Sequence, residues 1–190
     1  MNPTLKYFKM HPEVFSPEFA TWASACFDLK AFIHPDFPIS SWSTLNYKTT
    51  IKPYIQSEFW VDPGSRVLIP TGLIFDIPQG YSVRLHIRSS LAAKCGITLA
   101  NAEGVIDSDY VEEVFVILWN ISENAVTITS GDRIAQAELV KSESYSVAET
   151  FVRPIPKTNR TGGMGSTGIN TVNNIVKIIR LGGRVAHVFT

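Results

Sequence analysis

The sequence predicts an all-β protein folded as an antiparallel jelly roll or β-barrel. Short runs of β-branched and large apolar residues recur along the chain, and turn-forming Gly, Pro, Asn and Asp separate them at close intervals. In the middle of the chain only the stretch 89–94 is a good helix former, and it is short. The Gly-rich segment 154–168 near the C-terminus is expected to form a flexible arm.

The N-terminal half is expected to supply the first strands. Residues 3–20 are interrupted by prolines and should form a lead-in strand or loop. The segment 39–60 is rich in Ser, Thr and Tyr without clear periodicity, so we expect a long loop whose aromatic side chains pack against another surface. Strands are expected at 25–33, which carries Asp28, at 66–69 and 72–76, which Pro70 and Thr71 separate, and at 81–87.

A β-hairpin with an acidic turn is expected at the centre of the chain. The run 97–100 enters it and the run 114–119 leaves it, with Asn, Gly and Asp residues between them. Just upstream, Ser89 is expected to cap the short helix, so that the free N–H groups of its first turn favour an anion. Further strands are expected at 125–129 and 133–140, and a second hairpin about Gly182-Gly183.

Composition excludes several classes of protein. With 190 residues, 45% hydrophobic and 18% charged, the chain has ordinary globular composition. Its 17 basic and 17 acidic residues balance to a net charge of +0, which argues against a nucleic-acid surface. Cys26 and Cys95 form no disulfide framework and are expected to be reduced packing residues. No signal peptide or membrane span is expected, so a cytoplasmic, soluble protein is inferred.

Asp107 is the best candidate for a catalytic base. A carboxylate can hold and deprotonate a water near neutral pH, although an isolated Asp-Ser-Asp could be only a solvated turn. Arg88 and two serines precede the hairpin, and the run Arg160-Thr-Gly-Gly-Met-Gly-Ser-Thr-Gly168 offers hydroxyls, backbone N–H groups and a cation. Such groups suit a phosphate chain.

Five motifs in order resemble those of the trimeric dUTPase family. They are Ala25-Cys-Phe-Asp-Leu29, Arg88-Ser-Ser-Leu-Ala92, Gly104-Val-Ile-Asp-Ser-Asp-Tyr110, Gly131-Asp-Arg-Ile-Ala-Gln136 and Arg160 with Gly162-Gly-Met-Gly-Ser-Thr167. The resemblance implies hydrolysis of dUTP to dUMP and pyrophosphate. It also implies a dUTPase-like domain over 1–168, with an insertion at about 39–60 and a phosphate-binding arm over 154–168. Residues 169–190 are then a C-terminal extension, expected to be a β-hairpin.

The resemblance implies a role for each matching residue. Asp107 activates the water, and Asp28 approaches a Mg²⁺ ion through its water shell, with no direct protein ligand expected. The expected substrate-binding residues are Arg88, Ser89, Ser90, Asn101, Gly104, Val105, Ile106, Tyr110, Gln136, Arg160, Met164, Gly165 and Ser166. Uracil is read by the hairpin backbone, and Tyr110 lies under the deoxyribose. The expected partners are dUTP and two further copies of the chain, in a homotrimer with shared active sites, and neither nucleic acid nor membrane.

The chain departs from the family at three positions. Glu112 and Ser90 stand where dUTPases usually have Gly, and Met164 stands where an aromatic residue covers the uracil. Ser90 is a feature of the related dCTP deaminases, which are the alternative enzyme, but their catalytic Glu falls at Ile117 here, which cannot relay protons. A non-catalytic nucleotide-binding regulatory module is the other alternative.

Overall fold

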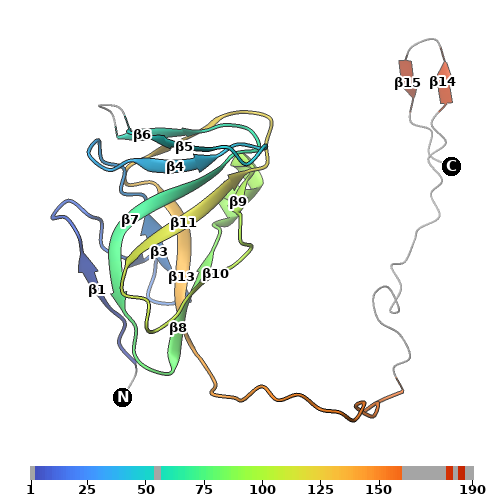
Figure 1. Cartoon of the computed structure of the whole chain (residues 1–190). Coiled ribbons are helices and arrows are strands. Elements are labelled where there is room, and N and C mark those ends of the chain that lie inside the picture. Colours follow the sequence, from blue (N-terminus) through green and yellow to red (C-terminus); the bar gives the residue numbers. More distant parts are fainter. Residues whose placement is uncertain (1–2, 54–56, 160–178, 182–183, 187–190) are drawn as a thin grey trace. The chain divides into compact units, whose positions relative to one another are not determined.

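The computed structural model describes residues 3–53, 57–159, 179–181 and 184–186 (Figure 1). The chain divides into two compact units, residues 1–145 and 146–190, and each is described by itself. The prediction of an all-β, antiparallel fold with almost no helix is confirmed. In the second unit, β14 (Ile179–Leu181) pairs antiparallel with β15 (Arg184–Ala186) on either side of residues 182–183. The proposed domain boundary at 168/169 stays a prediction.

One sheet of the first unit is built around its two longest neighbouring strands. The strand β7 (Arg66–Asp76) pairs with β11 (Glu113–Asn120). The remaining strands follow in the order β5-β4-β7-β11-β9, with β1 also pairing β7. Their bounds are Lys6–Lys9 for β1, Ile39–Trp42 for β4, Lys48–Ile51 for β5 and Ile97–Leu99 for β9.

The other large sheet carries Asp28 and Gln136, and Arg88 follows the end of one of its strands. Its order is β10-β8-β13-β3-β2, and every pair in it is antiparallel. The bounds are Glu18–Phe19 for β2, Phe27–Lys30 for β3, Tyr81–His86 for β8, Gly104–Ile106 for β10 and Arg133–Lys141 for β13. A two-stranded ribbon pairs β6 (Glu58–Val61) with β12 (Val126–Thr129).

The hydrophobic core joins the two large sheets. Alternate residues of β7 and β11 are fully buried, among them Ile69 and Val116. The second sheet buries Val83 and Leu29 in the same cluster. The ring of Phe27 on β3 meets that of Phe75 on β7 edge to face, with 6.1 Å between centroids. The period-2 pattern of the sequence therefore turns one face of each sheet toward the core.

The structure corrects four local predictions. The stretches 66–69 and 72–76 form the single strand β7, with Pro70 inside it. The expected loop 39–60 contains β4, β5 and the start of β6, and β4 joins the sheet at β7. The hairpin turn itself contains β10, which pairs with β8 in the opposite sheet. The short helix contains a π-helical turn over Leu91–Cys95, capped by Ser90 rather than Ser89, and Ser90 makes no side-chain capping bond.

No helix in the described part of the chain is long and apolar enough to span a membrane.

Near Pro70, side-chain hydrogen bonds replace part of the backbone hydrogen bonding between β7 and β11. Gly72 has a φ of +68°, and the register between β7 and β11 shifts here. The carboxylate of Glu113 accepts the Gly72 N–H at 2.8 Å, and the buried hydroxyl of Thr71 donates to the carbonyl of Val114 at 2.6 Å. The side chains of Glu113 and Thr71 therefore form hydrogen bonds with backbone groups that regular strand pairing would otherwise have bonded.

The carboxyl group of Glu113 should make the stability of the protein depend on pH. Burial raises the pKa of the Glu113 carboxyl above its ordinary 4.5, and the bond from Gly72 works in the opposite direction. Between 4.5 and the higher folded-state pKa, the folded protein binds more protons than the unfolded chain. This group's contribution to stability therefore falls as pH rises through that window.

Glu113→Gln should remove that slope while its amide oxygen still accepts the Gly72 N–H. Glu113→Ala should lose about 1–3 kcal/mol because the backbone N–H is left unsatisfied. Urea unfolding of all three proteins from pH 4 to pH 8 measures both effects. Parallel pH profiles for the wild type and Glu113→Gln would contradict the account.

Candidate active site

The central hairpin forms one wall of a pocket of about 480 Å³. Six residues predicted from the sequence to bind the nucleoside or activate water line it together. They are Asn101, Gly104, Val105, Ile106, Asp107 and Tyr110. The other wall is apolar and was not predicted, with Leu68, Leu85, Val114, Phe115 and Ile117. The pocket thus combines backbone polar groups, an apolar wall and one carboxylate, as small-molecule sites commonly do.

The backbone of the hairpin is fixed by close packing at Gly104. A Cβ atom on this residue would lie 2.8 Å from the Cβ of Leu85, so only glycine lets β10 approach β8. On the entering side, Ala102 adopts a φ of +62°, and the N–H of Glu103 donates to the carbonyl of Asn101 at 2.7 Å. A fixed backbone can present its N–H and C=O groups to a flat base.

Asp107 lies at the far end of β10 with its side chain exposed. Its carbonyl accepts the N–H of Tyr110 at 3.2 Å, which closes a turn over 107–110. Among the described residues the carboxylate of Asp107 makes no hydrogen bond or ion pair, and the same holds for Asp109. Neither aspartate caps its own turn, so the Asp107 carboxylate is available to a water at the pocket rim.

Tyr110 is held in place through its hydroxyl. The O–H donates to the carbonyl of Glu113 at 2.9 Å. Burial, and then the carboxylates of Glu112 and Glu113, raise the pKa of Tyr110, so this hydroxyl stays protonated at neutral pH and continues to donate. The ring is therefore a fixed side of the pocket.

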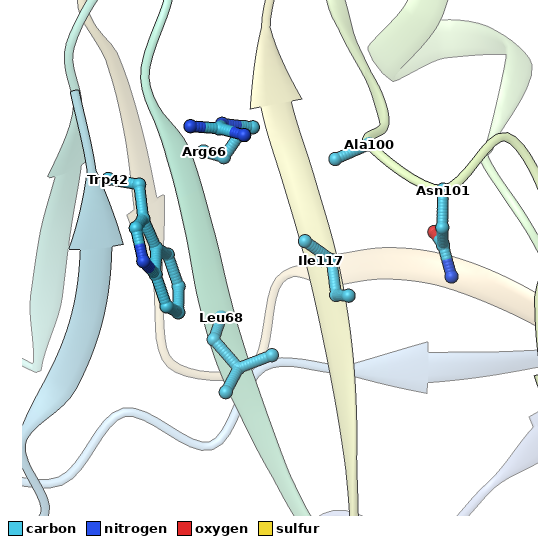
Figure 2. Close-up of a pocket in the computed structure, with 6 residues that line it drawn as sticks. All are labelled: Trp42, Arg66, Leu68, Ala100, Asn101 and Ile117. Carbon is cyan, nitrogen blue, oxygen red and sulfur yellow. The ribbon is translucent and has the colours of Figure 1, made fainter. Parts of the chain in front are cut away.

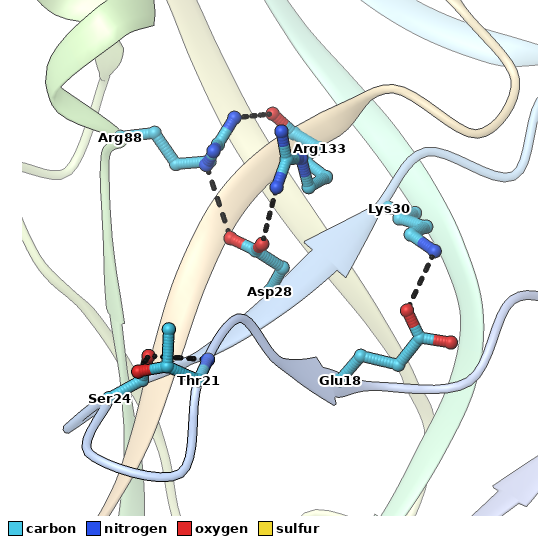
Figure 3. Close-up of polar contacts among 7 residues, drawn as sticks. All are labelled: Glu18, Thr21, Ser24, Asp28, Lys30, Arg88 and Arg133. Atoms are coloured by element: carbon cyan, nitrogen blue, oxygen red, sulfur yellow. Dashed lines mark hydrogen bonds and ion pairs between the residues drawn. The ribbon is translucent and has the colours of Figure 1, made fainter.

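A second cluster gathers around Asp28 on β3 (Figure 3). Its Oδ1 lies 3.1 Å from Nε of Arg88, and its Oδ2 lies 3.3 Å from Nη1 of Arg133. Nη1 of Arg88 also donates to the carbonyl of Arg133 at 3.5 Å. The Asp28 side chain is only 12% exposed. Arg88 was predicted to bind substrate and Asp28 to approach magnesium through water, and the structure pairs the two side chains.

Arg133 is a residue whose site position the sequence did not reveal. From the sequence, a structural role is the natural interpretation of Arg133, paired with Asp132 or with a neighbouring subunit. Instead its partner is Asp28, and Asp132 accepts the backbone N–H of Thr129 at 2.8 Å. The signal available in the sequence was its place in the fourth motif, three residues before Gln136.

The other predicted phosphate contacts lie near this second cluster. Gln136 is half-buried on β13, opposite Asp28 on one side and His86 on the other. Ser89 and Ser90 are exposed at the start of the short helix. The remaining predicted contacts, Arg160, Met164, Gly165 and Ser166, lie outside the described residues.

Along β8, Asp107 lies near the start of the strand and Arg88 follows its other end. Ile106 pairs with Val83, so Asp107 lies level with Ser82. Arg88 follows six residues further along, which is roughly 20 Å at about 3.3 Å per residue. A water-activating base must lie within about 3 Å of the water that it deprotonates. Asp107 and Arg88 of one chain therefore cannot serve the same scissile phosphate.

A smaller apolar pocket of about 320 Å³ adjoins the hairpin pocket through Leu68, Asn101 and Ile117 (Figure 2). Trp42 closes its other side, and the stretch 39–60 thereby reaches the neighbourhood of the site. Nζ of Lys48 lies 5.5 Å from the Trp42 ring centroid, and the Arg66 guanidinium holds the β4–β5 turn at Ser43 and Asn46. Trp42 thus packs on the sheet, as the aromatic side chains in the stretch 39–60 suggested.

Neither a nucleophilic thiol nor a metal cage accompanies these groups in the described part of the chain. Burial, and then the carboxylates of Glu138 and Asp28, raise the pKa of the Cys26 thiol, which keeps it protonated at neutral pH. No three His, Cys, Asp or Glu of the described residues form a group that could hold a metal ion. The predicted contact of Asp28 with magnesium through water stays a prediction.

Comparisons with known proteins identify relatives of this chain by sequence and by fold. A dUTPase family profile matches residues 53–168, more than half of the chain. The deoxyuridine 5'-triphosphate nucleotidohydrolase of Caulobacter vibrioides is 38% identical over 154 residues, covering 80% of this chain and 85% of the relative. That of Desulfotalea psychrophila is 45% identical over 116 residues, covering 60% of this chain and 76% of the relative.

Solved structures share the fold at low sequence identity. The dUTPase of Staphylococcus bacteriophage 80alpha with dUPNHPP superposes with a TM-score of 0.67 at 18% identity, covering 87% of this chain and 99% of that one. The Streptococcus mutans dUTPase gives a TM-score of 0.57 at 21% identity, covering 75% and 98%. The all-β fold, together with sequence relatives that are named nucleotidohydrolases, identifies an all-β nucleotide hydrolase. With the family profile and the sequence relatives, the chain belongs to the dUTPase family.

Proposed function

We propose that this chain hydrolyses dUTP to dUMP and pyrophosphate, using a water that Asp107 deprotonates. One observation carries the proposal: six residues of the hairpin line a single pocket, with the exposed, unpaired carboxylate of Asp107 at its rim. The names of the sequence relatives support the same reaction. General-base assistance of this kind contributes roughly 10²–10⁴-fold to the rate.

The hairpin selects the base and the sugar. Uracil presents acceptor, donor and acceptor along its pairing edge, which main-chain groups of residues 101–106 can match. Since Gly104 locks β10 onto β8, these groups are fixed before substrate arrives. Tyr110 lies under the deoxyribose and leaves no space for a 2′-hydroxyl.

Phosphate binding falls to residues from other copies of the chain. The separation of Asp107 and Arg88 along β8 supports a homotrimer in which one subunit supplies the hairpin and another supplies the arginine cluster. Arg88 binds the phosphates, Ser89 and Ser90 contact them through hydroxyls and backbone, and Gln136 assists. The arm residues Arg160, Met164, Gly165 and Ser166 complete the contacts to phosphate and base.

The substrate is the magnesium complex of dUTP. The family generally uses Mg²⁺, and a triphosphate brings this ion with most of its water shell. The described residues offer no cage of three acidic, His or Cys ligands. Asp28 approaches this ion through its water shell, while cations and backbone groups of the protein bind the triphosphate.

A deaminase activity is not favoured. The position that would carry the deaminase glutamate is Ile117, whose side chain lines the apolar wall of the pocket. An isoleucine can exchange no proton with the amino group of cytosine. The decisive assay incubates the full chain with Mg²⁺ and either dUTP or dCTP. Pyrophosphate from dUTP alone supports the proposal, and ammonia from dCTP or no product from either overturns it.

Tyr110 variants should separate sugar selection from catalysis. Tyr110→Ala should admit a 2′-hydroxyl, so that a preference for dUTP over UTP of about 100-fold falls to a few-fold. Tyr110→Phe keeps the ring, loses only the bond to the Glu113 carbonyl, and should retain most of the preference. The ratio of kcat/KM for the two nucleotides is the measurement. An unchanged ratio in Tyr110→Ala would remove the ring from sugar selection.

A further inference from the structure

The carboxylate of Asp28 is committed to two arginines. Each of its oxygens faces a different guanidinium, Arg88 at 3.1 Å and Arg133 at 3.3 Å. The three side chains come from three separate segments: β3, the residues just after β8 and the start of β13. The carboxylate is the least exposed of the three, at 12%, against 23% for Arg88 and 50% for Arg133. It lies beneath the cations rather than in solvent.

We propose that Asp28 is a positioning residue that holds Arg88 and Arg133 together as one phosphate-binding unit. The proposal rests on the function proposed above, and it adds Arg133 to the residues that bind the pyrophosphate part of the substrate. Two guanidinium charges against one carboxylate leave the unit with an excess of one positive charge. Planar guanidinium groups bind phosphate oxygens in pairs, and fixing them beforehand reduces the entropy lost on binding.

The neighbouring acidic side chains do not compete with Asp28 for the two arginines. The cluster opens on a pocket of about 410 Å³ that is also lined by Glu18, Lys30 and Asp132. Glu18 and Lys30 pair with each other at 3.2 Å, and Asp132 accepts the N–H of Thr129. The other acidic groups of this pocket therefore have partners of their own, and the arginines depend on Asp28.

The direction in which Asp28→Asn changes the affinity for pyrophosphate distinguishes this positioning role from a purely electrostatic or metal-linked role. The probe is inorganic pyrophosphate, titrated calorimetrically into the full-length protein without Mg²⁺. If Asp28 positions the arginines, Asp28→Asn should weaken metal-free pyrophosphate binding by about tenfold, although it removes a negative charge from an anion site. If Asp28 serves only a magnesium ion, the same change should leave that binding equal or tighten it. Equal or tighter binding overturns the proposal.

A double-mutant cycle gives the second test. In the wild-type background, Asp28→Asn should lower kcat/KM for dUTP about tenfold, mainly through KM. In an Arg88→Ala, Arg133→Ala background it should have less than about a twofold further effect, because the groups through which it acts are gone. Full, additive losses would contradict the proposal. Glu18→Gln is the matched control, since it removes one negative charge from the same pocket without touching either arginine.

A variant that fails to fold must be distinguished from one that folds and binds pyrophosphate weakly. Thermal unfolding of each variant identifies any that fails to fold. If Asp28→Asn does, Arg88→Lys takes its place, because it keeps the charge but cannot reproduce the bond from Nε to Asp28. It should weaken metal-free pyrophosphate binding by a similar factor, and unchanged binding overturns the proposal. A wild-type chain that releases no pyrophosphate from dUTP would refute the proposed reaction, while the pyrophosphate titrations would still test the role of Asp28.

Discussion

Asp107→Asn should abolish dUTP turnover while leaving nucleotide binding intact. The amide has the shape of the carboxylate and fills the same place at the pocket rim, but it cannot take a proton from water. The loss should reach at least roughly 10²–10⁴-fold in kcat, the range that general-base catalysis supplies. Pyrophosphate release measures the rate, and calorimetry with a non-hydrolysable dUTP analogue measures the affinity.

Asp109→Asn is the matched control. Asp109 belongs to the same acidic turn, is exposed like Asp107, and has no hydrogen-bond or ion-pair partner among the described residues. The same change of charge at this position should leave kcat within a few-fold of wild type. Normal pyrophosphate release by Asp107→Asn, or equal losses in the two variants, would remove Asp107 from its assigned role.

The architecture of the fold was accessible from the sequence because strand periodicity is local. Alternation in 81–87 places Val83 and Leu85 on one face, and the structure buries both against the core. The predicted hairpin strands pair as expected, with Leu118 opposite Leu99. A run of alternating residues carries this information without reference to the rest of the chain.

The errors fall where tertiary pairing overrides local signals. Pro70 predicted a break in β7, but the register shift opposite it and the side chains of Thr71 and Glu113 keep the strand continuous. The short strand β10 looked like part of a turn, and only its fit against Leu85 makes it a strand of the second sheet. Partners distant in the sequence decide both outcomes, and no local pattern reports them.

The candidate site divides in the same way. Motif order made Asp28, Arg88 and Asp107 individual candidates, because residue type and spacing are visible in the sequence. The ion pairs that join Asp28 to Arg88 and Arg133 are not, since they connect residues up to 105 positions apart. Likewise, the apolar wall formed by Leu68, Val114 and Ile117 reads as ordinary strand sequence until the strands are assembled.

Two strongly impaired variants should restore activity to each other. Asp107→Asn keeps the arginine cluster, and Arg88→Ala keeps the hairpin carboxylate. The two groups lie roughly 20 Å apart within one chain, and the proposed trimer draws them from different subunits for each site. In randomly mixed trimers at equal concentrations, a site is complete when one chain contributes Asp107 and its neighbour contributes Arg88, which occurs for about one quarter of the sites.

Unfolding and refolding the two variants together should therefore recover about a quarter of the wild-type rate per subunit. Each variant refolded alone should keep only its own low residual rate, and native variants mixed without unfolding should show no more than the average of those rates. A double variant carrying both changes, refolded with wild type, gives the matched control. In this mixture about one quarter of the sites are again complete, because both subunits that contribute to a site must then be wild type. Activity that stays at the level of the separate variants would place Asp107 and Arg88 in one chain's site and refute the shared arrangement.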